Sequence, residues 1–564
     1  MTDWDHSTDL LVVGSGAGVV AALRARSLGK TALVVEKAEL FGGSTCMSGG
    51  ILWLPNNPLM RREGVDDSRD AALRYFDTVV GDAGPASSPA RRSTFVDRGS
   101  EMVDFLEGEG VEFRRCEGYS DYYAGVRGVE GGSARGRSLE TTAFDRKKLG
   151  DWQHHVRPGF SPDLNIYTVE AAALSQMRTR IGITTVLRVI FRTLLGKLRG
   201  QHLVTNGEAL MSRLLDALLR RDVEVWRESP VSELIVDDGR VVGAVVVHDG
   251  RRLRVRAHDG VVIAAGGFAR NEQMRQEYAG GRGPVTGTWT SANPGDTGEV
   301  IKMALALGAE TDMLDEAWWM PSWFLADGTP MMCLSERTKP HSIIVDSSGQ
   351  RYFNEAVAYQ EAGQQMYARE KDTGGAVPSW LIVDQWHRNH YAFMDAVPGR
   401  TPKKWIETGS MKRAKTLDDL ASQCGIDPVG LRATVDRFNT FAAAGVDEDF
   451  HRGEGDHERF YGDVTHKPNA CLGPIDKAPY YAVALYPGDI GTSGGLLCDE
   501  NSRVLDTEGR VIEGLYATGN STASVMGRKY PGAGASIAAS AVFGYVAAEH
   551  ACGAATSTGR HPGE

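Results

Sequence analysis

The chain has 564 residues, of which 42% are hydrophobic and 24% are charged, and its formal net charge is −11. This length allows two or more globular domains, and the acidic balance argues against general nucleic-acid binding. There is no run of 18 apolar residues and no secretory signal before the first expected strand, so we expect neither a membrane-spanning helix nor export.

The cysteines point to a reducing compartment and not to a disulfide or metal framework. The chain has seven of them, an odd number, and none is spaced CxxC or CxxCH. Such scattered cysteines are typical of free thiols in a cytoplasmic protein. No spacing of His and Cys suits a metal, so we expect no metal site and no covalently attached c-type haem.

The N-terminal segment has the pattern of a dinucleotide-binding unit. Residues 9–13 predict a buried parallel strand, residues 19–28 a helix, and residues 31–35 a second strand that ends at Glu36. Between the first strand and the helix lies Gly14-Ser15-Gly16-Ala17-Gly18. This order gives a tight turn, a helix N-terminus for a pyrophosphate and an acid roughly 20 residues later for a ribose hydroxyl.

Two details refine this prediction. The third glycine, Gly18, comes one residue early and Val19 holds its usual place, so we expect the helix to pack slightly differently on its strand. A second glycine-rich stretch, Phe41–Thr45 followed by Ser48–Gly50, comes shortly after Glu36. A flavin needs such a loop over its pyrophosphate and ring system, whereas the alternative is a plain turn.

The segments with cofactor-domain character come from both ends of the chain. Residues 204–270 predict a helix, strands and a hairpin that continue the N-terminal domain, and Gly514–Asn520 resembles a strand returning to it. We therefore predict an α/β protein with a discontinuous Rossmann-like domain, residues 1–313 and 489–564, and an inserted α+β domain, residues 314–488.

A turn near the C-terminus suggests a site for a carbonyl group. Tyr530-Pro531-Gly532-Ala533-Gly534 precedes an apolar helix of small residues at 538–548. The tyrosine hydroxyl and a nearby backbone N–H could converge on one oxygen, and a helix N-terminus adds partial positive charge. The alternative is a turn that only leads into a core helix.

Residues 177–200 stand apart because they contain no acid. Two helix faces are expected there, one basic and one apolar, formed by Arg188, Arg192 and Arg199 and by Leu187, Ile190, Leu194 and Leu198. Such a helix suits a membrane surface or an anionic partner. A solvated helix that caps the cofactor domain is the equal alternative.

Together the segments resemble the 3-ketosteroid Δ1-dehydrogenases, FAD enzymes of steroid breakdown in the fumarate reductase/succinate dehydrogenase flavoprotein superfamily. The resemblance covers almost the whole chain. It depends on residues 14–18, 36–37, 41–45, 48–50, 119–123, 264–268, 315–319, 354–359, 445–450, 488–495 and 530–534. The glycine motifs alone would fit many flavoproteins, whereas the three tyrosine positions together with the last two motifs are more specific.

The resemblance implies non-covalent FAD in the larger domain and a steroid bound where a smaller catalytic domain meets it. It also implies the residues that contact FAD. These are Gly14, Ser15, Gly16, Ala17, Gly18, Glu36, Lys37, Gly43, Ser44, Val231, Ala265, Gly266, Gly519, Asn520, Ala535 and Ile537. The physiological electron acceptor is left open.

The implied reaction desaturates ring A, with a proton leaving C2 and a hydride leaving C1 for flavin N5. By position, Tyr359 resembles the base, Tyr122 the tyrosine that hydrogen-bonds to it, and Tyr530 with the Gly534 N–H the pair that polarises the C3 carbonyl. A tyrosine has a pKa near ~10, so the base needs a neighbour that stabilises its phenolate. Tyr119 or Tyr123 could replace Tyr122 in that role.

Three other functions stay open. A fumarate- or urocanate-type reductase would need arginines that clamp a carboxylate, and the insert contains Arg337, Arg351 and Arg369. A 4-ene-forming 3-ketosteroid dehydrogenase of the same superfamily is a closer alternative. The third is a non-catalytic, membrane-peripheral flavin-binding protein, against which Tyr359 and Tyr530 argue. Trp318 and Trp319 are expected in a domain wall, where one could line a sterol pocket.

Overall fold

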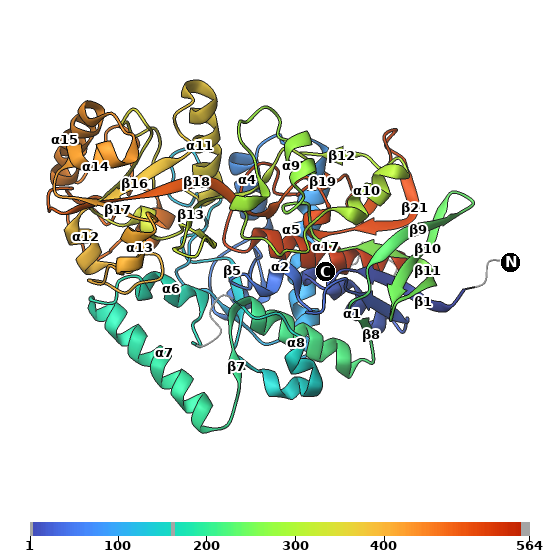
Figure 1. The fold of residues 1–564 in the computed structure, drawn as a ribbon. Coiled ribbons are helices and arrows are strands. Elements are labelled where there is room, and N and C mark those ends of the chain that lie inside the picture. The colour runs from blue at the N-terminus through green and yellow to red at the C-terminus, as the bar shows by residue number, and fades with distance from the viewer. Residues whose placement is uncertain (1–3, 160–163, 554–564) are drawn as a thin grey trace, which may run out of the picture.

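The computed structural model describes residues 4–159 and 164–553. Figure 1 shows a larger body that contains segments from both ends of the chain and a smaller body built mainly from residues 317–492. Each body contains one main β-sheet covered by helices. The fold is thus of the mixed α/β kind that the sequence predicts.

The sheet of the larger body joins strands that are far apart in sequence. The central strands are apolar and buried on both faces, as expected for parallel pairing. Val261 in β11 pairs with Leu515 in β21, which lies 254 residues later in the chain (515 − 261). The sheet order is β20 (Arg503–Leu505), β21 (Val511–Ala517), β11 (Arg251–Ile263), β1 (His6–Val13), β2 (Ala32–Val35) and β8 (Glu224–Trp226), and the hairpin β9 (Val231–Asp237) and β10 (Arg240–His248) joins at β11.

Helix α17 (Ala535–Ala551) lies in the core of this body, against α1 (Val20–Ser27) and α5 (Pro89–Gly108). Its residues are apolar on all sides, which is the pattern of a fully buried helix. A Cβ atom on Gly18 would lie 2.6 Å from the Ala264 Cβ, so the early third glycine serves close packing. At the other end of α17, Glu549 pairs with Arg24 at 2.7 Å and also with Arg98.

The sheet of the smaller body is antiparallel, and its long strand β18 reaches back toward the larger body. Its order is β14 (Pro330–Met332), β13 (Ala317–Phe324), β18 (Tyr480–Thr492), β16 (Ser379–Val383) and β15 (Ser342–Val345), with β17 (Lys412–Ala414) also on β18. Helices α11 (Tyr359–Thr373), α14 (Leu417–Cys424) and α15 (Pro428–Ala444) cover it.

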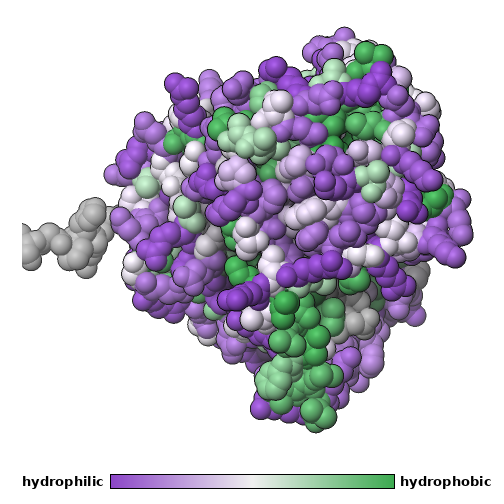
Figure 2. All heavy atoms as spheres, turned by 90° about the vertical axis from the view of Figure 1, so that its left-hand side faces the viewer, coloured by the Kyte–Doolittle hydropathy of each residue, from purple (hydrophilic) through white to green (hydrophobic). Residues whose placement is uncertain are grey.

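The basic segment forms helix α7 (Arg180–Leu198), which packs against α6 (Thr168–Leu174). The helix prediction is confirmed, but the faces are unusual. The buried face carries small and β-branched residues, namely Gly182, Thr185, Val189, Thr193 and Gly196. Most of its large apolar side chains are exposed instead, and Figure 2 shows hydrophobic atoms gathered at that end of the molecule. Among the described residues, no helix is long and apolar enough to cross a bilayer.

Candidate active site

One continuous cavity runs from the main sheet of the larger body to β13 of the smaller body. At one end it is lined by Gly14 and Glu36, which follow β1 and β2. At the other end it is lined by Tyr122, Tyr359 and Tyr530. The predicted cofactor motifs and the predicted catalytic residues therefore share one site.

Backbone geometry shapes the first end of the cavity, which we call the glycine end. Gly14 has φ +106°, and a Cβ atom there would lie 2.3 Å from the Ala264 carbonyl oxygen, so only glycine fits. The buried Glu36 carboxylate accepts hydrogen bonds from the Ser15 N–H at 3.1 Å and the Ala38 N–H at 2.8 Å. These contacts hold the acid at the edge of the cavity, where a ribose hydroxyl can reach its remaining lone pairs.

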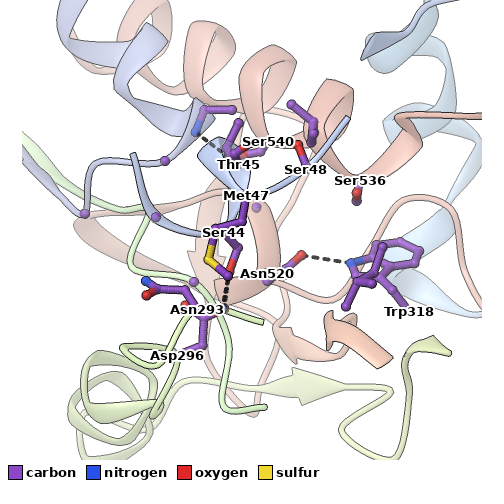
Figure 3. A pocket seen from close by; sticks show the side chains of 18 of the residues that line it. Ser44, Thr45, Met47, Ser48, Asn293, Asp296, Trp318, Asn520, Ser536 and Ser540 are labelled. Atoms are coloured by element: carbon purple, nitrogen blue, oxygen red, sulfur yellow. Dashed lines mark hydrogen bonds between the residues drawn. The ribbon is translucent and has the colours of Figure 1, made fainter. Parts of the chain in front are cut away.

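The second glycine-rich loop closes over the same end. Its turn has φ +116° at Gly42, and the short helix α2 (Gly43–Cys46) follows. The Ser44 hydroxyl donates to Asp296 at 2.9 Å, as Figure 3 shows, and the Thr45 hydroxyl accepts from the Ala17 N–H at 3.2 Å. The two glycine loops and the 293–298 loop thus form one cradle.

Asp296 is a cavity residue that we did not predict. It is buried, and burial raises the pKa of its carboxyl to about 7. Asn293, Met47 and Ser540 also line the cavity near it and were missed. The sequence Asn293-Pro-Gly-Asp-Thr-Gly298 is a turn-rich loop that would have been a signal.

All but two of the sixteen predicted cofactor residues line the cavity. The exceptions are Gly18, which packs on Ala264, and Ala535, which is fully buried at the start of α17. The cavity lined by the other residues, with its glycine cradle and buried acid, suits a dinucleotide.

The other end of the cavity, which we call the tyrosine end, gathers aromatic rings from separate elements. Tyr122 lies in the loop before β5 (Ser138–Thr141), Tyr359 begins α11, and Tyr530 precedes α17. The ring centroid of Tyr359 lies 5.5 Å from that of Tyr122 and 4.9 Å from that of Tyr530. The Trp318 ring packs edge-on to Tyr530 at 5.1 Å, and its indole N–H donates to Asn520 at 2.9 Å (Figure 3). Trp318 therefore joins the two ends.

Gly534 presents a free backbone donor beside Tyr530. It caps the N-terminus of α17 with φ +89°, and a Cβ atom on it would lie 2.1 Å from the Ile51 carbonyl oxygen. Its own carbonyl accepts from the Trp53 N–H at 3.3 Å. Among the described residues, its N–H has no hydrogen-bond acceptor. A free donor at a helix N-terminus is suited to an oxygen that gains negative charge.

Three tyrosine hydroxyls form a chain along this end of the cavity. The Tyr122 and Tyr119 hydroxyls are 3.4 Å apart, and those of Tyr119 and Tyr461 are 2.5 Å apart. Tyr119 and Tyr461 line the cavity too, whereas Tyr123 does not. Tyr461, the last residue of α16 (Asp456–Tyr461), was not predicted, because no motif surrounds it.

Burial controls the protonation of this cluster. It raises the pKa values of Tyr119, Tyr122 and Tyr359 well above 10. We expected Tyr122 to favour a phenolate at Tyr359, yet in the protein alone burial, and after it the neighbouring Tyr122 and Tyr530, all raise the Tyr359 pKa. A phenolate base therefore needs a further source of stabilisation.

Comparisons with known proteins agree with this cavity. Residues 9–537 match the model of a family described as an FAD binding domain. The match covers most of the chain, so the protein belongs to this flavoprotein family and is an FAD-dependent oxidoreductase.

Relatives identify the branch of that family. A 3-oxosteroid 1-dehydrogenase of Mycolicibacterium smegmatis is 42% identical over 556 residues, covering 96% of each chain. A 4-oxocyclohex-2-ene-1-carboxylate 5-dehydrogenase of Sinomonas cyclohexanicum is 35% identical and covers 95% of this chain and 92% of its own. The crystal structure of a 3-ketosteroid Δ1-dehydrogenase from Sterolibacterium denitrificans, in complex with 1,4-androstadiene-3,17-dione, matches with a TM-score of 0.91 and 36% identity, covering 97% of this chain and all of the other. The chain belongs to the 3-oxosteroid 1-dehydrogenase family, as its motifs predicted.

Proposed function

We propose that the protein introduces the C1–C2 double bond into ring A of a 3-ketosteroid, with FAD as electron acceptor. One observation carries this proposal: the Tyr530 hydroxyl and the free Gly534 N–H lie beside Tyr359. All three residues line the same cavity, which continues to the glycine end. A ketone oxygen held by the two donors would bring its α-carbon to a phenol, and its β-carbon toward the cofactor.

The residues of this chain would work as follows. Tyr530 and Gly534 donate to the C3 oxygen and stabilise the enolate that develops, each worth about 2.7–4 kcal/mol by analogy with other oxyanion donors. Tyr359, as phenolate, would remove the C2 proton, and Tyr122, whose ring centroid lies 5.5 Å from that of Tyr359, would support it by donating a hydrogen bond. FAD, when bound, accepts the hydride from C1.

FAD would be held without a covalent bond by a domain built from residues 1–313 and 489–564. The joining of β21 to β11 in one parallel sheet supports this discontinuous division. The insert would supply Tyr359 and one wall of the steroid site. Its end, set at residue 488 from the sequence, falls inside β18 (Tyr480–Thr492), which favours a boundary near Thr492.

The test is product analysis with purified, FAD-loaded protein and an artificial electron acceptor. Androst-4-ene-3,17-dione should yield the 1,4-diene. Formation of a C4–C5 double bond from a saturated 3-ketosteroid, without C1–C2 desaturation, would assign the 4-ene-forming reaction instead. The panel should include 4-oxocyclohexanecarboxylate, because relatives are named for ring ketones of that kind, and a dicarboxylate to test the fumarate-type reaction.

We further propose that α7 holds the protein on an anionic membrane surface in the cytoplasm. Leu187, Phe191, Leu194 and Leu198 are 54–86% exposed, which is unusual for large apolar side chains on one helix. Among the described residues, Arg180, Arg188 and Lys197 form no ion pair with a carboxylate, although Arg192 is bound to Glu170. An apolar ridge flanked by free cations, on a chain of net charge −11, complements anionic lipid.

Sedimentation with phosphatidylglycerol-containing vesicles tests this proposal. The variant Leu187→Ser/Phe191→Ser/Leu194→Ser should bind at least about tenfold more weakly, with unchanged turnover of dissolved steroid. Val429→Ser/Val446→Ser is a matched control, since these side chains are 62% and 51% exposed in the smaller body. Equal vesicle binding by all three proteins would leave α7 as a solvated helix.

A further inference from the structure

Arg337 is a buried cation without a counter-ion. It lies on the short 3₁₀ turn Glu336–Thr338 and is 0% exposed. One guanidinium nitrogen, Nη1, donates to the Glu355 carbonyl, whereas Nε and Nη2 have no hydrogen-bond partner. Among the described residues, no carboxylate forms an ion pair with it, in contrast to most of the arginines of this body.

The neighbouring carboxylates are already used by other arginines. Arg351 pairs with Glu355 and Asp447, each at 2.7 Å, and Arg452 pairs with Glu355 at 3.1 Å. Burying an uncompensated charge costs several kcal/mol, and an arginine cannot avoid this cost by losing its proton. Such a residue is retained only where its charge has a use or where packing demands the side chain.

The groups around Arg337 connect it to the tyrosine cluster. The Thr338 hydroxyl, next in the chain to Arg337, donates to the Tyr461 carbonyl at 3.0 Å. From this turn a phenolate on Tyr122 or Tyr461 would stabilise the Arg337 guanidinium electrostatically. The His457 ring lies between them, with its centroid 4.1 Å from that of Tyr122 and 5.2 Å from that of Tyr461. Both of its ring nitrogens lack partners. Burial, and secondarily Arg337, lowers the His457 pKa to about 3, so this ring is neutral.

The other charged groups near Arg337 do not neutralise it. Burial raises the pKa values of Glu336 and of the Cys333 thiol, and Glu336 has Lys339 as its basic neighbour. The Lys339 ammonium donates to the Tyr461 carbonyl, and burial lowers its pKa to about 8. Arg452 donates to the Arg337 carbonyl at 3.1 Å, and its own charge is paired with Glu355. Among the described residues, Arg337 and Lys339 are therefore cations beside the tyrosine chain that form no ion pair.

We infer that Arg337 is the fixed positive charge that stabilises a phenolate in the tyrosine cluster, and that it acts as a positioning residue through Tyr122 and Tyr461 without touching the substrate. The inference rests on the proposed function, which requires a tyrosine base. Burial disfavours a phenolate at Tyr359, and Tyr122 alone does not compensate for this cost. The charge of Arg337 supplies the missing stabilisation.

The proton balance of this step is simple. Before reaction the cluster lacks one proton and is neutralised by Arg337. The C2–H bond breaks and its proton binds the phenolate oxygen, while the C1–H electron pair leaves with its hydrogen as hydride to FAD. The cluster must then lose one proton before the next turnover. The hydroxyl chain from Tyr122 through Tyr119 to Tyr461, with contacts of 3.4 Å and 2.5 Å, offers that proton a path from Tyr122 to Tyr461.

The first test compares pH profiles of kcat/KM for FAD-loaded Arg337→Gln and Arg337→Lys. Losing the charge should raise the apparent pKa of the base by at least about one unit, which is a tenfold loss of activity below that pKa. Alkaline pH should restore the activity of Arg337→Gln. Arg337→Lys keeps the charge and should shift the pKa less. An unchanged profile in Arg337→Gln would overturn the inference.

Arg388→Gln is the matched control. Arg388 is equally buried and also has no carboxylate partner among the described residues, but it packs on Phe393 and Trp405, and its Nη2 donates to the Arg400 carbonyl. It should lower stability without moving the pH profile. The same shift in both variants would assign the effect to a general loss of structure and would contradict the inference.

A second readout does not depend on steroid turnover. Ultraviolet difference titration should detect one tyrosine in the wild-type protein that ionises at least about one pH unit lower than in Arg337→Gln, and Arg337→Lys serves if the glutamine variant does not fold. If the steroid assay fails but this shift is seen, the proposed function is wrong and the electrostatic role stands. Absence of the shift refutes the role, whatever the substrate.

Discussion

The two ends of the cavity are built in different ways. The glycine end is made mainly of backbone, with Gly14 and Gly42 in left-handed conformations and hydrogen bonds that join neighbouring loops. The tyrosine end is made of side chains contributed by four distant segments, whose hydroxyls are buried. The first end can bind a cofactor through shape alone, whereas the second depends on the protonation of a few phenols.

The strongest test of this contrast is Tyr359→Phe. If Tyr359 is the base, kcat should fall by about 10²–10⁴-fold. FAD binding should be unchanged, because Tyr359 belongs to the tyrosine end. Stopped-flow reduction of the flavin by steroid, with the flavin spectrum as a control for cofactor content, measures both quantities. A near-normal rate would remove Tyr359 from the mechanism.

Tyr530→Phe should cost about 10²–10³-fold, since one of the two donors to the ketone oxygen is lost. Ala533→Gly changes another residue of the same turn without removing a hydrogen-bond donor, and its turnover should fall much less. Steady-state rates for both variants show whether the Tyr530 hydroxyl or the shape of the turn is needed. Equal losses would mean that the turn acts through its shape and not through the hydroxyl.

Gly534→Ala tests the one backbone group on which the tyrosine end depends. The new Cβ atom would meet the Ile51 carbonyl at 2.1 Å in a backbone conformation of φ +89°. We expect a loss of about 2–5 kcal/mol in the free energy of unfolding, together with reduced turnover. Denaturant unfolding of the FAD-loaded variant measures the first effect. Wild-type stability would show that the turn can shift freely.

The last test concerns stability alone and lies at the glycine end. Burial raises the Asp296 pKa from 3.8 to about 7, so between these pH values the folded protein binds more protons than the unfolded chain. Asp296 therefore lowers the stability of the cofactor-free protein as pH rises through this window. Asp296→Asn should remove a loss on the order of 4 kcal/mol above pH 7. Melting temperatures from pH 5 to 8 check this, and parallel curves for the two proteins would contradict it.

The contrast also explains what the sequence could predict. The glycine end follows from local pattern, because strand, turn, helix and acid are contiguous from residue 9 to Glu36. The early position of Gly18 is explained by its close packing on Ala264. The tyrosine end did not follow from pattern. The turn pattern suggested Tyr530, but Tyr122 and Tyr359 were identified only through resemblance, and Tyr461 and Arg337 acquire their places only when α16 and the 336–338 turn pack together.

The helix α7 shows a different limit. Its periodicity predicted a basic face and an apolar face, but the face that is buried is a third one, of small and β-branched residues, which we did not predict. The small face packs on the protein because Gly182 and Gly196 allow close approach, with a Gly196 Cβ position only 2.7 Å from the Leu203 side chain. Tertiary contact thus overrides the usual rule that the larger apolar face turns inward.

The burial of α17 on all sides has a consequence for how this enzyme can diversify. One end carries the Gly534 donor and the other is fixed by Glu549 to two arginines, so few substitutions along the helix can be absorbed. New substrate preferences must therefore arise on the facing wall, where Met320, Met332, Leu334 and Ile490 line the cavity from the smaller body. Sequence variation across the family should concentrate on that wall and leave the two donors to the ketone oxygen, Tyr530 and Gly534, unchanged.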